Sequence, residues 1–213
     1  GPKGIKEIIT LQLKLANSWT NYPLNFHELT SEISETIYEK ESVSVETLPL
    51  DHRVYTNGFL FTLRSSCRKI NSKAINGLNL KPYHFDQLKK GLSILLEDGT
   101  NIKNNELTFD PEKPKRYAYC SDTSYNRDLI PLIKQVDLLY HESTFLEKDI
   151  HLAEKTKHST AIQAAKIAKE AKVKKLILGH YSSRYIDKNI FFNEASTVFK
   201  DVDLSEDFKT FLV

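Results

Sequence analysis

The sequence has no methionine, only two cysteines and no long apolar run. Cys67 and Cys120 do not form a C-x-x-C pair, so the sequence excludes a disulfide framework and indicates a reducing compartment such as the cytoplasm. A secretory signal and a run of membrane-spanning length are both lacking, so we expect no membrane partner. The formal net charge of +2 is too small to indicate nucleic-acid binding, which would have to show as local clustering.

The missing methionine leaves two interpretations of the start, "GPKGIKEIIT". Either the start is processed or a cloning remnant, or the chain is the C-terminal piece of a longer protein. Apolar residues make up 40% and charged residues 27% of the 213 positions, which is typical of a globular domain.

The first half of the sequence predicts mixed structure. Apolar spacing predicts an amphipathic helix over 4–16, and "ETIYE" and "SVSVETLPL" are typical of strands. "RVYTNGFLFTL" predicts two strands joined by an Asn-Gly turn, and "LEDGTNI" predicts a hairpin.

The second half alternates strands and helices, which favours an α/β layered domain. The strands are "YAYC", "VDLLY" and "KLIL", and "RDLIPLIKQV" predicts a short helix. "STAIQAAKIAKEAK" predicts a longer helix, with Thr160 and Gln163 as a capping box. Its alanines form one small-residue face that suits close packing on a sheet: Ala161, Ala164, Ala165, Ala168 and Ala171.

Each of these three strands is followed by polar residues that could carry chemistry. Asp122 follows the first strand, His141 and Glu142 follow the second, and His180 follows the third. His158 precedes the long helix. Functional sites gather at the carboxyl ends of strands in open α/β sheets, so a metal site or acid–base chemistry is one interpretation.

Each residue alone also has a structural interpretation. Asp122 could be the N-cap of the next helix, and His158 could be a cap or a surface residue. The pattern of residues leaves both interpretations open.

Four motifs then carry a family resemblance: "YCSDT", "YHESTF", "KHSTAIQAA" and "LILGHYSSRY". In this order they resemble the C-terminal motifs of the ribonuclease Z family, a branch of the metallo-β-lactamase superfamily. The resemblance spans nearly the whole chain, and "EDFKTF" near its end resembles the family's terminal strand. It implies a metallo-β-lactamase αββα sandwich, a two-zinc site, precursor tRNA as substrate, a homodimer and a cytoplasmic location.

The resemblance also implies roles for individual residues. Asp122 matches an aspartate that bridges both zinc ions, and His180 and His52 match histidine ligands. His158 matches a catalytic histidine that could protonate the leaving 3′ oxygen, with Glu142 orienting it. Arg184 is a candidate for holding the site or a phosphate. His27, His84 and His151 match no ligand of the family, so we expect them to be structural or surface residues.

The family's principal metal motif, H-x-H-x-D-H, does not occur in this sequence. We therefore expect residues 1–213 to form a single domain that corresponds to the C-terminal two-thirds of the family's chain. Two-zinc binding and catalysis by this chain alone are then not expected.

Residues 62–91 form a basic insertion, with seven basic residues against the single acid Asp86. Such a run is ordinarily a solvated face, but here it lies where the family carries an arm that grips tRNA. Tyr83 and Phe85 could add stacking to phosphate contacts. The candidate tRNA-binding residues are Arg64, Arg68, Lys69, Lys73, Lys81, Lys89 and Lys90.

The function that the resemblance implies is a zinc-dependent endoribonuclease that removes the 3′ trailer of precursor tRNA by two-metal phosphodiester hydrolysis. Two alternatives remain open. One is a small-molecule phosphodiesterase or other hydrolase of the same superfamily. The other is a non-catalytic fragment that binds RNA or pairs with a partner half.

Overall fold

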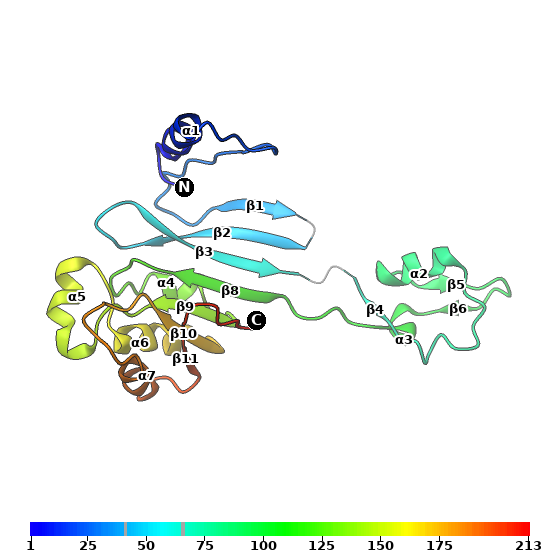
Figure 1. Cartoon of the computed structure of the whole chain (residues 1–213). Coiled ribbons are helices and arrows are strands. Elements are labelled where there is room, and N and C mark those ends of the chain that lie inside the picture. Colours follow the sequence, from blue (N-terminus) through cyan, green and yellow to red (C-terminus); the bar gives the residue numbers. More distant parts are fainter. Residues whose placement is uncertain (41, 65–66) are drawn as a thin grey trace. The chain divides into compact units, whose positions relative to one another are not determined.

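The computed structural model describes residues 1–40, 42–64 and 67–213 (Figure 1). The chain divides into two compact units. The first comprises Gly1–Glu39, Ser44–Thr62 and Arg116–Val213, and the second comprises Lys40–Val43 and Leu63–Lys115. No helix that the structure describes has both the length and the apolar character needed to cross a membrane.

A seven-stranded sheet forms the centre of the first unit. In spatial order its strands are β1 (Thr36–Lys40), β2 (Val43–Leu50), β3 (Thr56–Leu63), β8 (Lys115–Cys120), β9 (Leu138–Glu142), β10 (Lys175–Gly179) and β11 (Val202–Leu204). The strands from β8 to β11 are parallel, so their carboxyl ends share one edge. The helices of this unit are α1 (Ile5–Leu15), α4 (Leu129–Leu132), η1 (Glu147–Asp149), α5 (Ile150–Thr156), α6 (Ala161–Ala171) and α7 (Asn189–Ser196).

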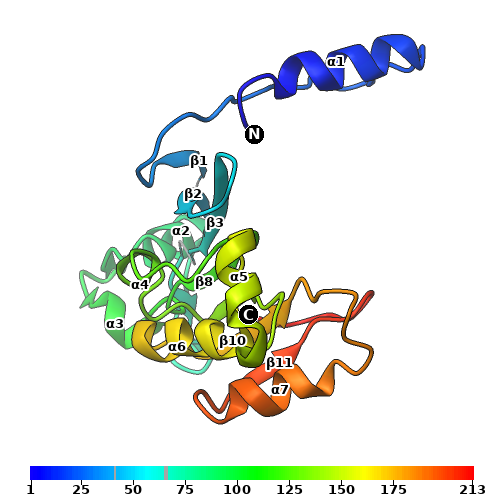
Figure 2. The same cartoon turned by 90° about the vertical axis from the view of Figure 1, so that its left-hand side faces the viewer.

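Helix α6 covers one face of the sheet. It packs on β9 and β10 between α4 and α7, and α7 packs on β11 (Figure 2). The predicted capping box is present, because the Gln163 N–H donates to Thr160 Oγ1 at 3.2 Å and the Thr160 N–H donates to Gln163 Oε1 at 2.9 Å. All five alanines of the predicted small-residue face are fully buried, which lets the helix lie close to the sheet.

The opposite face of the sheet carries aromatic side chains that remain partly exposed. Phe61 stacks on Tyr117 with ring centroids 5.8 Å apart, and Tyr119 stacks on Tyr140 at 4.7 Å. Phe61 and Tyr119 each keep 38% of their surface exposed. A groove of about 450 Å³ runs over Tyr117, Tyr119 and Tyr140, and Phe211 lies along it.

The predicted Asn-Gly turn is wrong. Asn57 and Gly58 lie inside β3, which is a continuous strand. A Cβ atom on Gly58 would lie 2.3 Å from the backbone oxygen of Tyr119. Glycine is therefore needed at this position for close approach of β3 and β8 rather than for a turn.

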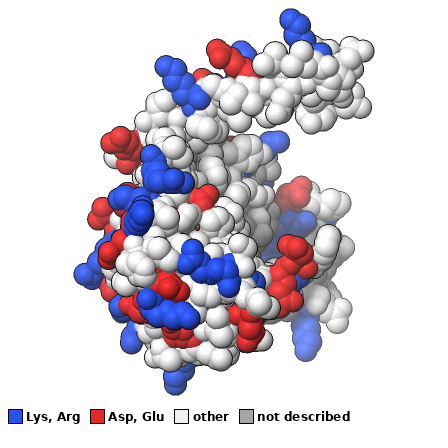
Figure 3. All heavy atoms as spheres, turned by 60° about the vertical axis from the view of Figure 1, so that its left-hand side comes forward, with Lys and Arg blue, Asp and Glu red and all other residues white. Residues whose placement is uncertain are grey.

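The terminal regions of the first unit carry little regular packing. Helix α1 forms where it is predicted but buries no residue. On the face of the molecule drawn in Figure 3, positive and negative side chains are interspersed. The predicted terminal strand in "EDFKTF" is wrong, because residues 206–211 contain a turn and no strand. The sheet ends instead at β11, whose Val202 and Leu204 are buried.

The second unit has a small core of its own, formed by Leu88, Ile94 and Leu107. Its elements are β4 (Lys69–Ile70), α2 (Pro82–Lys89), β5 (Ile94–Leu95), β6 (Asn101–Ile102), α3 (Asn104–Leu107) and β7 (Thr108–Phe109). Strands β5 and β6 form the predicted hairpin, with Gly99 at φ +84° in its turn. The unit contains the basic insertion from Leu63 onward and continues to Lys115, while residues 65 and 66 of that insertion lie outside the described residues.

Candidate active site

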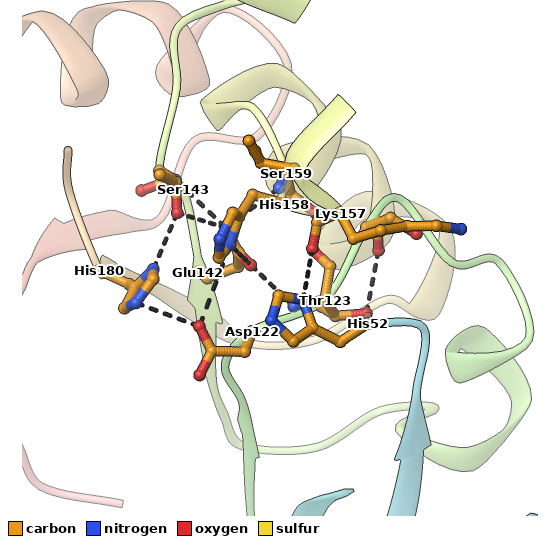
Figure 4. Close-up of polar contacts among 12 residues, drawn as sticks. His52, Asp122, Thr123, Glu142, Ser143, Lys157, His158, Ser159 and His180 are labelled. Carbon is orange, nitrogen blue, oxygen red and sulfur yellow. Dashed lines mark hydrogen bonds and ion pairs between the residues drawn. The ribbon is translucent and has the colours of Figure 1, made fainter. Parts of the chain in front are cut away.

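The parallel strands bring four polar side chains together at their carboxyl ends (Figure 4). Asp122 follows β8, Glu142 ends β9 and His180 follows β10, while His158 lies between α5 and α6. One possible ligand atom from each of these four residues lies within 4.8 Å of all the others. Asp122 Oδ1 and His180 Nε2 are 3.1 Å apart.

The Glu142 carboxylate is fully buried and organises this cluster. Its Oε1 accepts hydrogen bonds from the Thr123 N–H at 2.7 Å and from His158 Nδ1 at 2.7 Å. Its Oε2 accepts from Thr144 Oγ1 at 2.6 Å, the Ser159 N–H at 3.0 Å and the Thr144 N–H at 3.3 Å. Burial by itself would raise the pKa of Glu142, but the hydrogen bonds outweigh it and lower that pKa.

His158 is held by this carboxylate. Because Nδ1 donates to Glu142, Nε2 remains available on the other side of the ring. The hydrogen bond to Glu142 raises the pKa of His158, against the opposing effect of partial burial. A raised pKa favours the protonated imidazole, which is the form that a general acid requires.

A second chain of hydrogen bonds orients His180. The Thr144 hydroxyl has one hydrogen, which it donates to the ionised Glu142, so its oxygen accepts from His180 Nδ1 at 2.8 Å. In neutral His180, the Nε2 lone pair then faces Asp122 Oδ1 across 3.1 Å. Two lone pairs at this distance repel each other, and either a proton on Nε2 or a metal cation between them would remove the repulsion.

His52 stands beside the cluster, with its ring centroid 5.1 Å from that of His158. Its Nδ1 lies 2.9 Å from the Lys157 carbonyl oxygen, which can only accept a hydrogen bond. Nδ1 therefore carries a proton, and in the neutral ring the Nε2 lone pair is free. His52 is the one predicted metal ligand outside the four-residue cluster.

Left-handed backbone conformations shape the site. Asp122 has φ +61° and His180 has φ +59°, a region that residues other than glycine seldom adopt. Such conformations concentrate at functional sites, where the surrounding structure holds them. Gly179 precedes His180, and a Cβ atom there would lie 2.1 Å from the Tyr140 hydroxyl oxygen, so any other residue would require the Tyr140 ring to move.

The donor set fits a divalent metal. An imidazole nitrogen and a carboxylate oxygen bound tetrahedrally to one zinc ion, each about 2.0–2.2 Å from it, would lie about 3.3–3.6 Å from each other. Asp122 and His180, at 3.1 Å, come close to this spacing, and His52 presents its Nε2 beside them. By contrast, five protein donors already surround Glu142, which therefore suits an orienting role better than ligation.

Arg184 and the remaining histidines are not among the four residues of the cluster. The Arg184 guanidinium lies over the Phe145 ring at 5.1 Å, and its Nε donates to Ser182 Oγ. His27 and His151 are exposed. His84 is buried in the second unit, where its Nδ1 accepts from the Lys81 N–H at 3.2 Å.

Acidic residues beyond position 91 neutralise part of the basic insertion. Arg68 pairs with Asp110 at 2.5 Å, Lys69 pairs with Glu112, and Lys81 pairs with Glu97. The exposed side chains of Lys73, Lys89 and Lys90 have no ion-pair partner among the described residues. Arg64 is exposed and has an interaction partner.

Sequence reasoning missed the residues that orient the histidines. Thr144 binds both Glu142 and His180, and Lys157 binds His52 through its backbone. The Ser159 N–H donates to Glu142. The available signal was adjacency, because Thr144, Lys157 and Ser159 all lie within two residues of a predicted site residue.

Comparison with known proteins gives consistent relatives. The Ribonuclease Z of Cytophaga hutchinsonii is 45% identical over the whole of this chain, which covers 68% of that protein. The Ribonuclease Z of Bacteroides fragilis is 37% identical over 97% of this chain and 68% of its own length. The chain thus spans about two thirds of the length of these relatives.

Solved structures show the same fold. Human tRNase Z, short form, aligns with a TM-score of 0.62 and 20% identity, covering 98% of this chain and 64% of that one. The metallo-β-lactamase fold protein YhfI from Bacillus subtilis aligns with a TM-score of 0.52 and 18% identity over 81% of this chain and 50% of that one. No protein-family model matches the chain. The fold is that of the metallo-β-lactamase superfamily. Because the whole of this chain aligns with a Ribonuclease Z at 45% identity, the chain belongs to the ribonuclease Z family.

Proposed function

We propose that this chain carries part of the active site of a metal-dependent endoribonuclease that removes 3′ trailers from precursor tRNA. Membership of the ribonuclease Z family supports this reaction, and one structural observation supports placing the reaction at this site. That observation is the pairing of His158 with buried Glu142, 2.7 Å apart, next to the facing Asp122 and His180. An acid held in this way beside a cation site is the arrangement that hydrolysis of a phosphodiester needs.

Asp122, His180 and His52 are the proposed metal ligands on this chain. Two zinc ions, when bound, would polarise the scissile phosphate and activate water for in-line attack. His158 then protonates the leaving 3′ oxygen, and Glu142 holds its imidazole in place. The products are a 3′ hydroxyl on the tRNA and a 5′ phosphate on the trailer.

Three ligands do not complete a two-metal centre. The sequence contains no H-x-H-x-D-H motif. We propose that a segment with this motif must supply the other ligands, and that the 213-residue chain alone does not cleave RNA.

The second unit is proposed to bind the body of the tRNA. Of the predicted basic residues, Lys73, Lys89 and Lys90 are the best candidates because no carboxylate among the described residues pairs with them. Lys69 and Lys81 are paired with Glu112 and Glu97 and should contribute less. The family resemblance further supports a homodimer in the cytoplasm.

The test joins this chain to a ribonuclease Z segment that carries H-x-H-x-D-H and maps the ends of the products from precursor tRNA. A 3′ hydroxyl at the tRNA end, lost with chelation and in Asp122→Ala, is the expected result. Cleavage of a small diester such as bis(p-nitrophenyl) phosphate without cleavage of precursor tRNA would favour the small-molecule hydrolase instead.

The role of the second unit is tested in the same joined protein. Changing Lys73, Lys89 and Lys90 to Gln should weaken tRNA binding and lower the slope of affinity against salt concentration by up to about 3. The control changes Lys69 and Lys81 to Gln, which should have a smaller effect. Hydrolysis of the small diester should stay the same in both, and equal losses on both substrates would instead assign the unit a structural role.

A further inference from the structure

An ion pair between Asp51 and Lys157 joins two loops beside the candidate active site. Lys157 Nζ lies 3.1 Å from Asp51 Oδ1 and 3.0 Å from Oδ2. The Asp51 carboxylate also accepts the Ser124 hydroxyl hydrogen, and its backbone oxygen accepts from the Ser124 N–H at 2.8 Å. Asp51 thus connects the end of β2 to the loop that follows β8 and to the segment between α5 and α6.

The backbone of Lys157 orients the imidazole ring of His52. Its carbonyl oxygen accepts from His52 Nδ1 at 2.9 Å, and this bond selects the tautomer whose Nε2 lone pair is free (Figure 4). His158 is the next residue in the chain. The same short backbone segment therefore places the His158 side chain and binds the ring of His52. A change in the orientation of Lys157 would therefore reach His52 directly.

Lys157 adopts a left-handed conformation, with φ +60° and ψ +49°, at the C-terminal end of α5. Glycine is the usual residue at such a position. Lys172 has nearly the same conformation at the end of α6, φ +55° and ψ +41°. The conformation alone therefore implies no role. The two lysines differ in their contacts, because the exposed Lys172 side chain has no partner among the described residues.

We propose that Lys157 is a positioning residue, which through its ion pair with Asp51 holds its carbonyl on His52 Nδ1 and so directs His52 Nε2 into the active site. The proposal rests on the proposed function where it treats His52 as a metal ligand. The selection of the tautomer by the Lys157 carbonyl does not depend on that function. Bonds of this kind, one step removed from the metal, typically change metal affinity by about 10- to 100-fold when they are lost.

The primary test measures the His52 tautomer in the metal-free 213-residue chain. Magic-angle-spinning ¹⁵N NMR of histidine-labelled protein distinguishes Nδ1–H from Nε2–H, and it does not require a soluble monomer. The spectrum of His52→Gln identifies the His52 signals among those of the seven histidines. The unchanged chain should show His52 in the Nδ1–H form at a pH where the ring is neutral.

Lys157→Gly removes the ion pair but keeps a residue that favours the left-handed conformation, so the fold should persist. His52 should then shift toward the Nε2–H form that free imidazole prefers. Asp51→Asn should give the same shift, and Lys157→Arg, which keeps the charge, should restore the original tautomer. Lys172→Gly is the matched control and should leave His52 unchanged.

An unchanged His52 tautomer in both Lys157→Gly and Asp51→Asn would overturn the proposal. The second measurement is the affinity for Zn²⁺ in the joined protein, which should fall about 10- to 100-fold in Lys157→Gly and stay constant in Lys172→Gly. If no variant binds Zn²⁺, the proposed function fails, while the tautomer shift still decides the role of Lys157.

Discussion

Glu142→Gln is the substitution whose effect can be worked out most fully from the structure. The change preserves the size of the side chain and removes its charge. The carboxylate accepts five hydrogen bonds, three of them from the backbone N–H groups of Thr123, Thr144 and Ser159. A glutamine amide can accept on one side only, so in either orientation its NH₂ group faces a backbone N–H that loses its partner.

The expected loss follows from these contacts. A buried donor left without a partner costs about 1–3 kcal/mol. Breaking a buried charged pair, here Glu142 with His158, costs about 3–5 kcal/mol. Since these contributions overlap, we predict that Glu142→Gln lowers the free energy of unfolding by about 3–5 kcal/mol.

The effect should depend on pH in a defined way. The pKa of His158 is raised above 6.5, so its pairing stabilises the fold fully below about pH 6.5 and is lost as the pH rises through the raised value. The pKa of Glu142 is lowered below 4.5, so its contribution is full above about pH 4.5 and is lost as the pH falls through the lowered value. The difference between Glu142→Gln and the unchanged chain should therefore be largest between these two limits.

Urea denaturation of the chelator-treated chain at several pH values is the assay. Glu154→Gln is the control, because Glu154 is exposed and its change should stay within about 0.5 kcal/mol. A loss below about 1 kcal/mol for Glu142→Gln, or a difference that does not vary with pH, would refute the role assigned to this carboxylate.

Three further predictions concern turnover, geometry and association. In the joined protein, His158→Ala should keep its zinc and lose about 10²–10⁴-fold in rate; loss of zinc with the side chain would make His158 a ligand. Gly179→Ala should destabilise the chain by about 1–3 kcal/mol in thermal unfolding, because its Cβ would collide with Tyr140, and an unchanged midpoint would show that this contact relaxes freely. The chain alone should self-associate in sedimentation through its partly exposed aromatic face, and Phe61→Lys with Tyr119→Lys should reduce that association; a monomer before substitution would contradict this.

The sequence predicted the second half of the fold well because its signals are local. A capping box and an alanine face predict α6 without any knowledge of its partners, and short apolar runs predict β8, β9 and β10. The polar residues at the strand ends could be placed together because parallel strands share an edge. The Asn57-Gly58 prediction failed because Gly58 is required by its close contact with the backbone of Tyr119, which is distant in sequence.

The orienting contacts of the site could not be predicted for the same reason. Lys157 and Asp51 are 106 residues apart, and their pairing depends on a left-handed turn at the end of α5. The charge of the second unit was overestimated because Glu97, Asp110 and Glu112 lie beyond the basic insertion and pair back onto it. Composition of a window does not reveal which charges are neutralised by residues outside it.

We propose that Asp122, His180 and His52 form part of a two-metal centre that other ligands must complete. The most direct measurement is zinc per chain by elemental analysis, made on the 213-residue chain alone and after joining it to a segment with H-x-H-x-D-H. We predict fewer than two zinc ions for the chain alone and two for the joined protein, with cleavage of precursor tRNA appearing in the joined protein only. Two tightly bound zinc ions and full cleavage activity in the chain alone would contradict this prediction.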